Sequence, residues 1–396
     1  MTKDDFLLRR GVAQVLPDAE SLEKLMGERK IRVYLGIDPT GAVLHLGHSV
    51  VLRKLQQFVE LGHEVILLVG NGTVRIGDPT GRDSTRPELS DEQIRENFKT
   101  WQEQASKVVD FSKVKIAYNG DWLDKLTYTD IVKLLATTTV SQLLERDMFQ
   151  DRLQKNLPIF GHEIIYPLLQ GYDSTVMDVD LELGGTDQTF NMMMGRHLQR
   201  VYNNHEKWVL TTPIINGLDG RKMSKSFNNY VGLTEAPSEM YGKLMSMRDE
   251  MIFEYMTLLT ERDEAEITAM QEELAAGANP MLFKKILAHD LVSFYNSGEA
   301  ADEAAAEFER TIQNKALPSE IKMVQISVAE ISLKDLVKLC LPQESSANIK
   351  RLAEQGGVEI YDFDEPLGIE KVFPAATLDG RVLRVGKRNF FKFSVD

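Results

Sequence analysis

The segment from residue 31 to residue 69 constrains the fold most strongly, because it reads as a strand, a helix and a second strand in succession. Residues 31–37 (IRVYLGI) predict a strand, and apolar side chains at helical spacing predict a helix over residues 46–61 that stops at Gly62. Residues 64–69 (EVILLV) are apolar, which is typical of a buried parallel strand. A right-handed crossover makes these strands parallel neighbours, the opening of a doubly wound α/β sheet.

The same alternation continues downstream. Further strands are predicted at residues 113–118, 175–179 and 207–211, with helical stretches between them, and residues 1–29 are predicted to form a helical lead-in. The fold class is therefore a doubly wound, Rossmann-like parallel sheet, which is typical of nucleotide-binding domains.

The second half of the chain changes in character. Residues 235–316 are rich in Ala, Glu, Leu and Met without a strand pattern, whereas the tail combines two predicted helices (333–341 and 347–356) with short strands. We expect three domains. They are a catalytic nucleotide-binding domain over residues 1–230, a small helical domain over 231–325, and an α+β tail over 328–396.

Composition excludes several classes of protein. The net charge of −14 argues against a general nucleic-acid coat, although it leaves room for a local basic face. A single cysteine, Cys340, allows no disulfide within the chain and no cysteine-based metal site, and it fits a reducing compartment. Neither a signal peptide nor an apolar run of about 20 residues is evident, so we expect a cytoplasmic protein without a membrane partner.

The loop after the first strand carries the first phosphate-binding signal. Ligands bind beyond the carboxyl ends of parallel strands, and Asp38 to His48 lie there. His45 and His48 are three residues apart at the start of a predicted helix, where unpaired N–H groups and a partial positive charge favour phosphate. Gly47 lets a nucleotide approach the backbone. Alone, these histidines could equally be incidental.

A lysine-rich loop supplies the second signal. Lys222-Met223-Ser224-Lys225-Ser226 follows the glycine-flanked residues 217–221, and its two lysines can neutralise charge as pyrophosphate leaves. Most such pentapeptides are solvated basic loops, but the pairing with His45 and His48 favours a site that holds ATP phosphates from two sides.

Two other phosphate motifs are excluded. Residues 72–77 have the glycine spacing of a P-loop, but Asp78-Pro79 follows where Lys and Ser or Thr are needed. Arg75 occupies the place of the third glycine of a dinucleotide fingerprint.

The two phosphate motifs, with Gly36 to Thr40 before them and Gly184-Gly185-Thr186-Asp187-Gln188 between them, resemble those of the bacterial tyrosine–tRNA ligases, class I aminoacyl-tRNA synthetases. The resemblance covers essentially the whole chain, including an S4-like RNA-binding tail. It implies that tyrosine is activated with ATP to tyrosyl-adenylate and pyrophosphate, and is then transferred to the 3′ end of tRNA(Tyr). It also implies a homodimer.

A pocket that selects tyrosine over phenylalanine needs polar partners for the phenol, which phenylalanine would leave unpaired; tyrosine selection by this family is a standard illustration of that effect. Tyr166, Gln170 and Asp173 fall on one helical stripe, which is either a lined pocket or a solvent face. Pro167 fits such a helix if it lies in the first turn. The resemblance implies phenol binding by Tyr34 and Asp173, and binding of the α-ammonium group by Tyr166, Gln170 and Asp78. Asp78 could alternatively cap a turn before proline.

The resemblance assigns the remaining site residues. Thr40 and His45 are implied as γ-phosphate donors, Asp187 as a ribose acceptor, and Gln188 as a donor toward the tyrosine carboxylate or the α-phosphate. The implied catalytic residues are His45, His48, Lys222, Lys225 and Thr40; the implied ATP-binding residues are Gly36, Asp38, Gly47, Gly185, Asp187, Gln188, Met223, Ser224, Arg82 and Arg86. We expect Mg²⁺ to arrive with ATP, held mostly by phosphates and water, and no protein-bound metal.

The tail carries the predicted RNA contacts. They are Lys350, Arg351, Arg384, Lys387 and Arg388, a basic set typical of phosphate binding. The alternative is a basic hairpin that merely packs. The acidic turn at residues 361–364 departs from the Asn-Gly that family members usually carry, which weakens RNA affinity at that edge.

Three other functions compete. A tryptophan-specific relative is disfavoured by Tyr34 and Asp173, and a small nucleotidyltransferase by the two additional domains. An RNA-binding paralogue without aminoacylation has no physical need for both His45–His48 and Lys222–Lys225.

Overall fold

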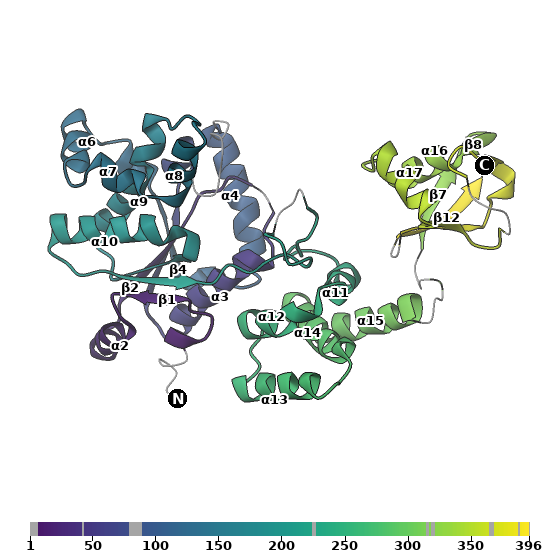
Figure 1. Cartoon of the computed structure of the whole chain (residues 1–396), viewed down its shortest axis with the longest axis horizontal. Helices are drawn as coiled ribbons and strands as arrows, with labels where there is room; N and C mark the ends of the chain where they lie inside the picture. The colour runs from purple at the N-terminus through teal and green to yellow at the C-terminus, as the bar shows by residue number, and fades with distance from the viewer. Residues whose placement is uncertain are drawn as a thin grey trace. The chain divides into compact units, whose positions relative to one another are not determined.

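The computed structural model describes residues 7–41, 43–78, 89–223, 227–313, 317, 321–363, 368–386 and 389–395. The chain divides into two compact units, one of residues 1–236 with 243–297 and the other of residues 237–242 with 298–396. Each unit is coloured by residue number in Figure 1.

A six-stranded sheet forms the centre of the first unit, in the order β1-β6-β5-β2-β3-β4 (Figure 1). All neighbours are parallel except β1, which pairs antiparallel with β6. The strands are β1 (Gln14–Leu16), β2 (Arg32–Ile37), β3 (Glu64–Val69), β4 (Val114–Tyr118), β5 (Leu181–Gly185) and β6 (Trp208–Thr212). This confirms the predicted parallel, doubly wound sheet.

Helices connect the strands of this sheet. They are α2 (Ala19–Glu28), α3 (Leu46–Glu60), α4 (Asp91–Ala105), α5 (Gly120–Leu123), α6 (Tyr128–Leu135), α7 (Val140–Leu144), α8 (Asp147–Gln154), α9 (Gly161–Met177) and α10 (Thr189–Asn203), with 3₁₀ turns η1 (Thr73–Arg75), η2 (Phe111–Lys113) and η3 (Thr186–Gln188). The crossover through α3 runs from β2 to β3, and the crossover through α10 runs from β5 to β6 on the other side. Right-handed crossovers in opposite directions place α3 and α10 on opposite faces of the sheet. The strand order therefore reverses between β2 and β5, where such sheets bind their ligands.

Two sequence predictions for this unit were wrong. The predicted strand at residues 175–179 is the end of helix α9, which closes at Asp178 in a left-handed conformation (φ 47°), and the strand begins at Leu181. The predicted helical lead-in does contain helix α2, but it also contains strand β1, whose hydrogen-bonding partner β6 lies far away in the sequence. Short apolar runs do not distinguish helix from strand, and an edge pairing leaves no local signal.

Helix α9 also corrects the placement of Pro167. The helix begins at Gly161, so Pro167 lies inside it and not in its first turn. Its polar stripe does not face solvent, because Tyr166 and Asp173 are buried. Helices α9 and α10 pack closely at Gly171, where an added Cβ would lie 3.0 Å from the backbone nitrogen of Gly195.

A run of helices follows the sheet. These are α11 (Pro237–Met245), the turn η4 (Asp249–Met251), α12 (Ile252–Leu259), α13 (Glu264–Ala275) and α14 (Pro280–Tyr295). Helix α12 packs on α13 and α14 and reaches α3 beside the sheet. Arg10 caps the end of α12 by donating to the carbonyl oxygens of Thr257 and Thr260, both at 2.9 Å.

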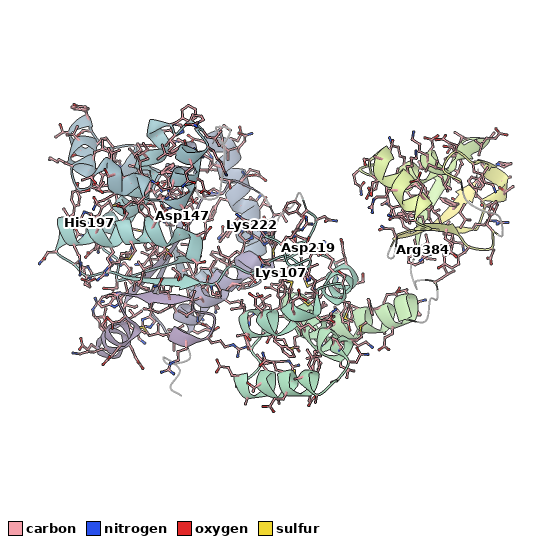
Figure 2. All side chains as sticks on the ribbon, in the orientation of Figure 1. Lys107, Asp147, His197, Asp219, Lys222 and Arg384 are labelled. Carbon is pink, nitrogen blue, oxygen red and sulfur yellow. The ribbon has the colours of Figure 1, made fainter. Side chains whose placement is uncertain are left out.

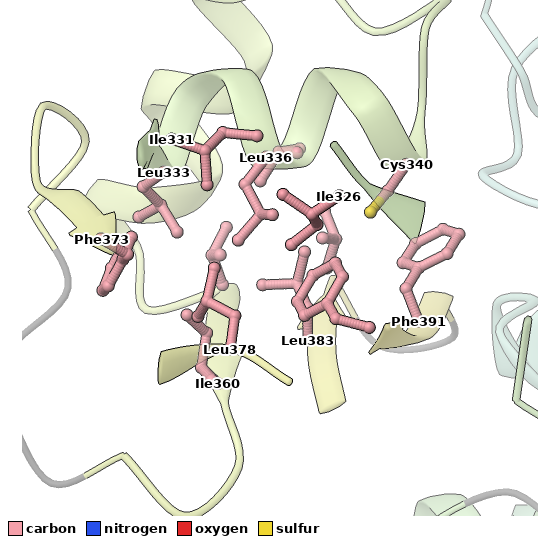
Figure 3. Packing of buried hydrophobic residues seen from close by; sticks show 14 of the residues in the cluster. Ile326, Ile331, Leu333, Leu336, Cys340, Ile360, Phe373, Leu378, Leu383 and Phe391 are labelled. Carbon is pink, nitrogen blue, oxygen red and sulfur yellow. The ribbon is translucent and has the colours of Figure 1, made fainter. Parts of the chain in front are cut away.

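The C-terminal unit combines helices with two small sheets, a four-stranded one in the order β7-β12-β11-β9 and the pair β10-β8. Its elements are α15 (Gly298–Phe308), the π-helix η5 (Glu309–Gln313), β7 (Lys322–Ile326), β8 (Glu330–Ser332), α16 (Leu333–Cys340), α17 (Ser346–Glu354), β9 (Val358–Ile360), β10 (Val372–Pro374), η6 (Ala375–Thr377), β11 (Val382–Val385) and β12 (Asn389–Val395). Leu336, Cys340 and Phe391 belong to its buried apolar core (Figure 3). None of the helices in the described part of the chain combines the length and apolar character that crossing a bilayer requires.

Candidate active site

A cavity of about 200 Å³ opens where the strand order reverses, at the carboxyl ends of β2 and β5. Polar side chains dominate its wall. The predicted site residues that line it are Tyr34, Gly36, Asp38, Thr40, Asp78, Tyr166, Gln170, Asp173 and Gln188. The structure thus brings together all five residues predicted for the amino acid, three of those predicted for ATP binding, and Thr40, which was predicted as catalytic.

Tyr34 and Asp173 form the buried end of the cavity. Tyr34 Oη lies 2.8 Å from Ser174 Oγ. The Asp173 carboxylate accepts from Asn119 Nδ2 at 3.0 Å and from Trp122 Nε1 at 2.8 Å. Burial raises the pKa of Asp173 well above its usual value, and these two donors oppose the shift. In its ionised form this carboxylate is a charged hydrogen-bond acceptor for a phenol.

Asp38 lies along the side of the cavity. Its carboxylate accepts from Tyr166 Oη at 2.9 Å and from Thr73 Oγ1 at 2.8 Å. Gly70 makes this possible, because a Cβ there would lie 2.0 Å from Asp38 Oδ1. Asp38 was predicted as an ATP residue; its carboxylate also fixes Tyr166, a residue predicted to hold the amino acid.

Asp78 and Gln188 meet in the cavity wall. Gln188 Nε2 donates to Asp78 Oδ2 at 2.8 Å, and Asn191 Nδ2 donates to Gln188 Oε1 at 2.9 Å. Arg146 lies 3.8 Å from Asp78. Asp38, Asp78 and Asp173 give the cavity a carboxylate-rich wall, which suits the ammonium group of an amino acid.

The two histidines begin helix α3. His45 is the N-cap residue, its backbone N–H donates to His48 Nδ1 at 3.2 Å, and the two ring centroids are 3.9 Å apart. A Cβ at Gly47 would lie 3.1 Å from the His45 ring and 3.4 Å from Met223 Sδ. Gly47 therefore keeps open the contact between the histidine motif and the start of the lysine loop.

Backbone pairing joins these distant motifs. Leu46 N donates to Val231 O at 3.0 Å, and Leu233 N donates to Leu44 O at 3.0 Å. The segment that follows the lysine loop thus forms a short ladder with the histidine motif, which places both motifs at one edge of the sheet.

Asp219 organises the start of the lysine loop (Figure 2). It accepts from Asn229 Nδ2 at 2.7 Å and from Arg221 Nε at 2.8 Å, and these hydrogen bonds lower the pKa of Asp219 to about 2. Asn229 also donates to Lys222 O at 3.1 Å. The two ends of the loop are therefore tied together, with the Lys222 side chain exposed. Ser224, Lys225, Arg82 and Arg86 lie outside the described residues.

Gly185 ends strand β5, and Asp187 follows in the turn η3. A Cβ at Gly185 would lie 2.7 Å from Asp187 Oδ1, so only glycine allows the Asp187 carboxylate to lie this close to the end of β5. Asp187 is exposed at the rim of the site. Among the described residues, no group of three or more His, Cys, Asp or Glu side chains could hold a metal ion.

Comparison with known proteins identifies this architecture. Residues 26–313 match the family model of the class I tRNA synthetases for tryptophan and tyrosine. The tyrosine–tRNA ligase of Thermotoga maritima is 44% identical over 391 residues, which cover 98% of this chain and 96% of the relative. That of Haemophilus influenzae is 44% identical over 384 residues, covering 97% and 94%.

The chain belongs to the tyrosine–tRNA ligases of class I.

Solved structures of tyrosyl-tRNA synthetases share the fold of this ligase. The C-terminally truncated mitochondrial enzyme of Aspergillus nidulans superposes with a TM-score of 0.66 at 20% identity, covering 78% of this chain and 94% of the other. The Archaeoglobus fulgidus enzyme, solved with L-tyrosine, gives a TM-score of 0.60 at 23% identity, covering 76% and 99%.

The ligase's predicted RNA-binding residues lie in its C-terminal unit. Arg384, labelled in Figure 2, lies on β11 and pairs with Glu359 on β9 at 2.6 Å. Arg351 Nη2 donates to Asn348 Oδ1 at 2.7 Å, and Lys350 lies 3.9 Å from Glu354. Lys387 and Arg388 lie outside the described residues.

Sequence reasoning missed the residues that support the ligase's cavity from behind. Asn119 and Trp122 follow strand β4, and their position after a parallel strand was an available signal. Glu182, which lines the cavity, lies in the apolar strand β5, and Lys207 directly precedes strand β6 after Glu206, so neither gave a signal in the sequence. Lys207 Nζ donates to Ser174 Oγ at 2.8 Å and forms a buried ion pair with Glu182.

Proposed function

We propose that this tyrosine–tRNA ligase binds the phenol of L-tyrosine between Tyr34 and Asp173, activates its carboxylate with ATP, and passes the tyrosyl group to tRNA(Tyr). One observation carries the assignment of the site. The polar cavity ends in a buried phenol and a buried carboxylate, and it lies at the sheet edge to which both phosphate motifs are brought.

The wall of the cavity supports distinct roles for its carboxylates. Asp78, together with Tyr166 and Gln170, would hold the α-ammonium group, and the tyrosine carboxylate would then point toward the histidine motif. That carboxylate is already ionised at neutral pH, so its attack on the α-phosphate needs no general base. Catalysis then consists of positioning and of stabilising the charge of the departing pyrophosphate.

The nucleotide would occupy the outer edge of the sheet. We assign the ribose to Asp187 beside Gly185, the α-phosphate region to Gln188, and the outer phosphates to Thr40, His45, His48 and the lysines of the 222–226 loop. Gly36, Gly47, Met223 and Ser224 complete this side, and Arg82 and Arg86 are assigned to pyrophosphate. Mg²⁺ would be held by the phosphates and water.

We also propose a homodimer. Large apolar side chains are exposed on α6, on α7 and at the N-cap of α9 in the first unit, including Tyr128 (85%), Val140 (64%) and Phe160 (48%). Contiguous exposed apolar surface marks an interaction site. Val140→Asp should shift the sedimenting species toward monomer, whereas Val201→Asp, at another exposed valine on α10, should leave the assembly unchanged. A monomeric wild-type chain would contradict the proposal.

The domain assignment follows the same reasoning. We propose catalysis in residues 1–230, a helical domain in 231–325, and an S4-like RNA-binding domain in 328–396 that uses Lys350, Arg351, Arg384, Lys387 and Arg388. We place the enzyme in the cytoplasm, where its single buried thiol stays reduced.

The deciding experiment is ATP–pyrophosphate exchange with each of the twenty amino acids in the absence of tRNA. Exchange with tyrosine alone is expected. Exchange with tryptophan would mean that Tyr34 and Asp173 do not read a phenol, and no exchange with any amino acid would favour an RNA-binding paralogue.

A further inference from the structure

Lys207 lies fully buried behind the phenol-reading end of the cavity. Its ammonium donates to Ser174 Oγ at 2.8 Å, to Met192 O at 3.1 Å, and to the Glu182 carboxylate. An ammonium group carries three N–H donors and no acceptor. All three hydrogens are therefore engaged, and Ser174 Oγ can only accept from Lys207.

This arrangement leaves the Ser174 hydroxyl hydrogen free for a further hydrogen bond. Ser174 Oγ lies 2.8 Å from Tyr34 Oη, and with one lone pair occupied by Lys207 its own hydrogen is available for the Tyr34 oxygen. Either hydroxyl can be the donor of this hydrogen bond. When Ser174 donates, Tyr34 accepts, and the Tyr34 hydrogen remains for another partner.

Glu182 is the competing partner for that hydrogen, since its carboxylate interacts with the Tyr34 phenol. Lys207 engages Glu182 Oε2, and Gln170 Nε2 donates to Glu182 Oε1 at 3.2 Å. Because both oxygens already accept and the charge is neutralised, Glu182 competes weakly with a phenol bound in the cavity.

Asp173 can act only as a hydrogen-bond acceptor toward the cavity while it is ionised. Both of its oxygens accept, from Trp122 Nε1 and from Asn119 Nδ2, so it faces the cavity as an acceptor. A phenol that donates its one hydrogen to Asp173 can only accept from Tyr34, and Tyr34 is then available to accept from Ser174.

Gly195 provides the space for this network. A Cβ at Gly195 would lie 2.4 Å from Lys207 Nζ and 2.6 Å from Ser174 Oγ. Helix α10 thus approaches α9 and β6 with a gap in which the ammonium and the hydroxyl meet.

We propose that Lys207, together with Glu182 and Ser174, is a positioning residue that holds Tyr34 as donor and Asp173 as acceptor, and thereby determines selection for a para-hydroxyl group. The inference rests on the proposed function, because it concerns how the same cavity reads tyrosine.

The direction of hydrogen bonding can be read with substrate analogues. Phenylalanine offers neither donor nor acceptor. The amino group of 4-aminophenylalanine can donate to Asp173, but its lone pair is delocalised into the ring and accepts weakly from Tyr34. A site that holds Tyr34 as donor therefore prefers tyrosine over both, and a site without this constraint discriminates less against the amine.

The test uses the full-length chain and two variants. Ser174→Ala removes the hydroxyl that connects Lys207 to Tyr34 by hydrogen bonds. The double variant Lys207→Met/Glu182→Gln removes both buried charges together, since Lys207→Met alone would leave the Glu182 carboxylate buried without its cation. Lys54→Met is the matched control, because Lys54 is another buried lysine whose ammonium donates to backbone carbonyls at 2.7 and 2.8 Å outside the cavity. For each chain, kcat/KM of ATP–pyrophosphate exchange is measured with tyrosine, phenylalanine and 4-aminophenylalanine.

Both cavity variants should lower the preference for tyrosine over each analogue by about five- to tenfold, the equivalent of one hydrogen bond. Lys54→Met should keep the wild-type preferences. The inference is overturned if Ser174→Ala keeps both preferences within twofold of wild type, or if kcat/KM for all three substrates falls equally. If the double variant does not fold, the result with Ser174→Ala alone tests the inference. A wild-type chain that does not exchange with tyrosine would instead overturn the proposed function.

Discussion

Replacing Asp173 with asparagine tests the phenol-reading end of the cavity directly. The substitution keeps the size and shape of the side chain but removes its charge. It also places an amide NH₂ opposite one of two donors, Trp122 Nε1 at 2.8 Å or Asn119 Nδ2 at 3.0 Å. The hydrogen bond to a substrate phenol changes from charge-assisted to neutral or is lost.

The magnitude follows from that change. A hydrogen bond to a charged group contributes about 1.5–3 kcal/mol. At about 1.36 kcal/mol per factor of ten, its loss should lower kcat/KM for tyrosine by roughly 10- to 150-fold. Phenylalanine makes no such bond, so its kcat/KM should stay the same or rise, and the tyrosine-to-phenylalanine ratio should fall by the same factor.

Pyrophosphate exchange with both amino acids measures this ratio. Asp121→Asn is the control, because it makes the same chemical change at an exposed residue of helix α5, outside the cavity. The ratio should also fall in the wild type as pH decreases through the raised pKa of Asp173, because the protonated carboxyl loses its charge, whereas Asp173→Asn should show no such dependence. An unchanged ratio in Asp173→Asn would refute the assignment of Asp173 to the phenol.

Three further predictions concern buried polar groups. Arg152→Met should lower the free energy of unfolding in urea by about 3–5 kcal/mol, because it leaves the Glu163 carboxylate buried without the cation that contacts both its oxygens at 2.9 Å. Arg152→Met/Glu163→Gln should recover most of that loss, and an unchanged stability of the single variant would contradict the pairing. Burial lowers the pKa of Lys54 to about 7, so between that pH and about 10 the unfolded chain binds a proton that the folded chain does not. The free energy of unfolding should therefore rise with pH in this window by up to about 1.4 kcal/mol per pH unit, an increase that Lys54→Met lacks. Burial raises the pKa of Cys340 to about 12, so a thiol reagent at pH 8 should label the native chain at least about 1,000-fold more slowly than the guanidinium-unfolded chain, and rapid native labelling would show that the C-terminal core is open.

The sequence predicted the central strands well because their signals are local. Residues 31–37 and 64–69 were expected as strands, and β2 and β3 occupy residues 32–37 and 64–69. Strand β5 was misplaced because the apolar stretch at residues 175–179 continues helix α9, and only packing against α10 decides between helix and strand there.

The same distinction between local and long-range signals applies to the residues of the site. Residues that meet a ligand at strand ends lie in short polar motifs, and those motifs could be recognised in the sequence. The residues that orient them come from other segments, as Asn119 and Trp122 do for Asp173 and Lys207 does for Ser174. Lys207 directly precedes strand β6 (Trp208–Thr212), and nothing in the local sequence separates a buried lysine there from an exposed one.

Glycines show why the folded geometry adds chemical information. Gly70 and Gly195 look alike in the sequence, yet a Cβ at Gly70 would collide with the Asp38 carboxylate and one at Gly195 with the Lys207 ammonium. Each glycine marks a place where a charged group must approach the backbone of another element. Gly70→Ala should therefore disturb the end of the cavity that Asp38 and Tyr166 form, and Gly195→Ala the end that Tyr34 and Ser174 form. Gly195→Ala should weaken the preference for tyrosine over phenylalanine, whereas Gly70→Ala should chiefly raise KM for both amino acids, because both carry the same ammonium group.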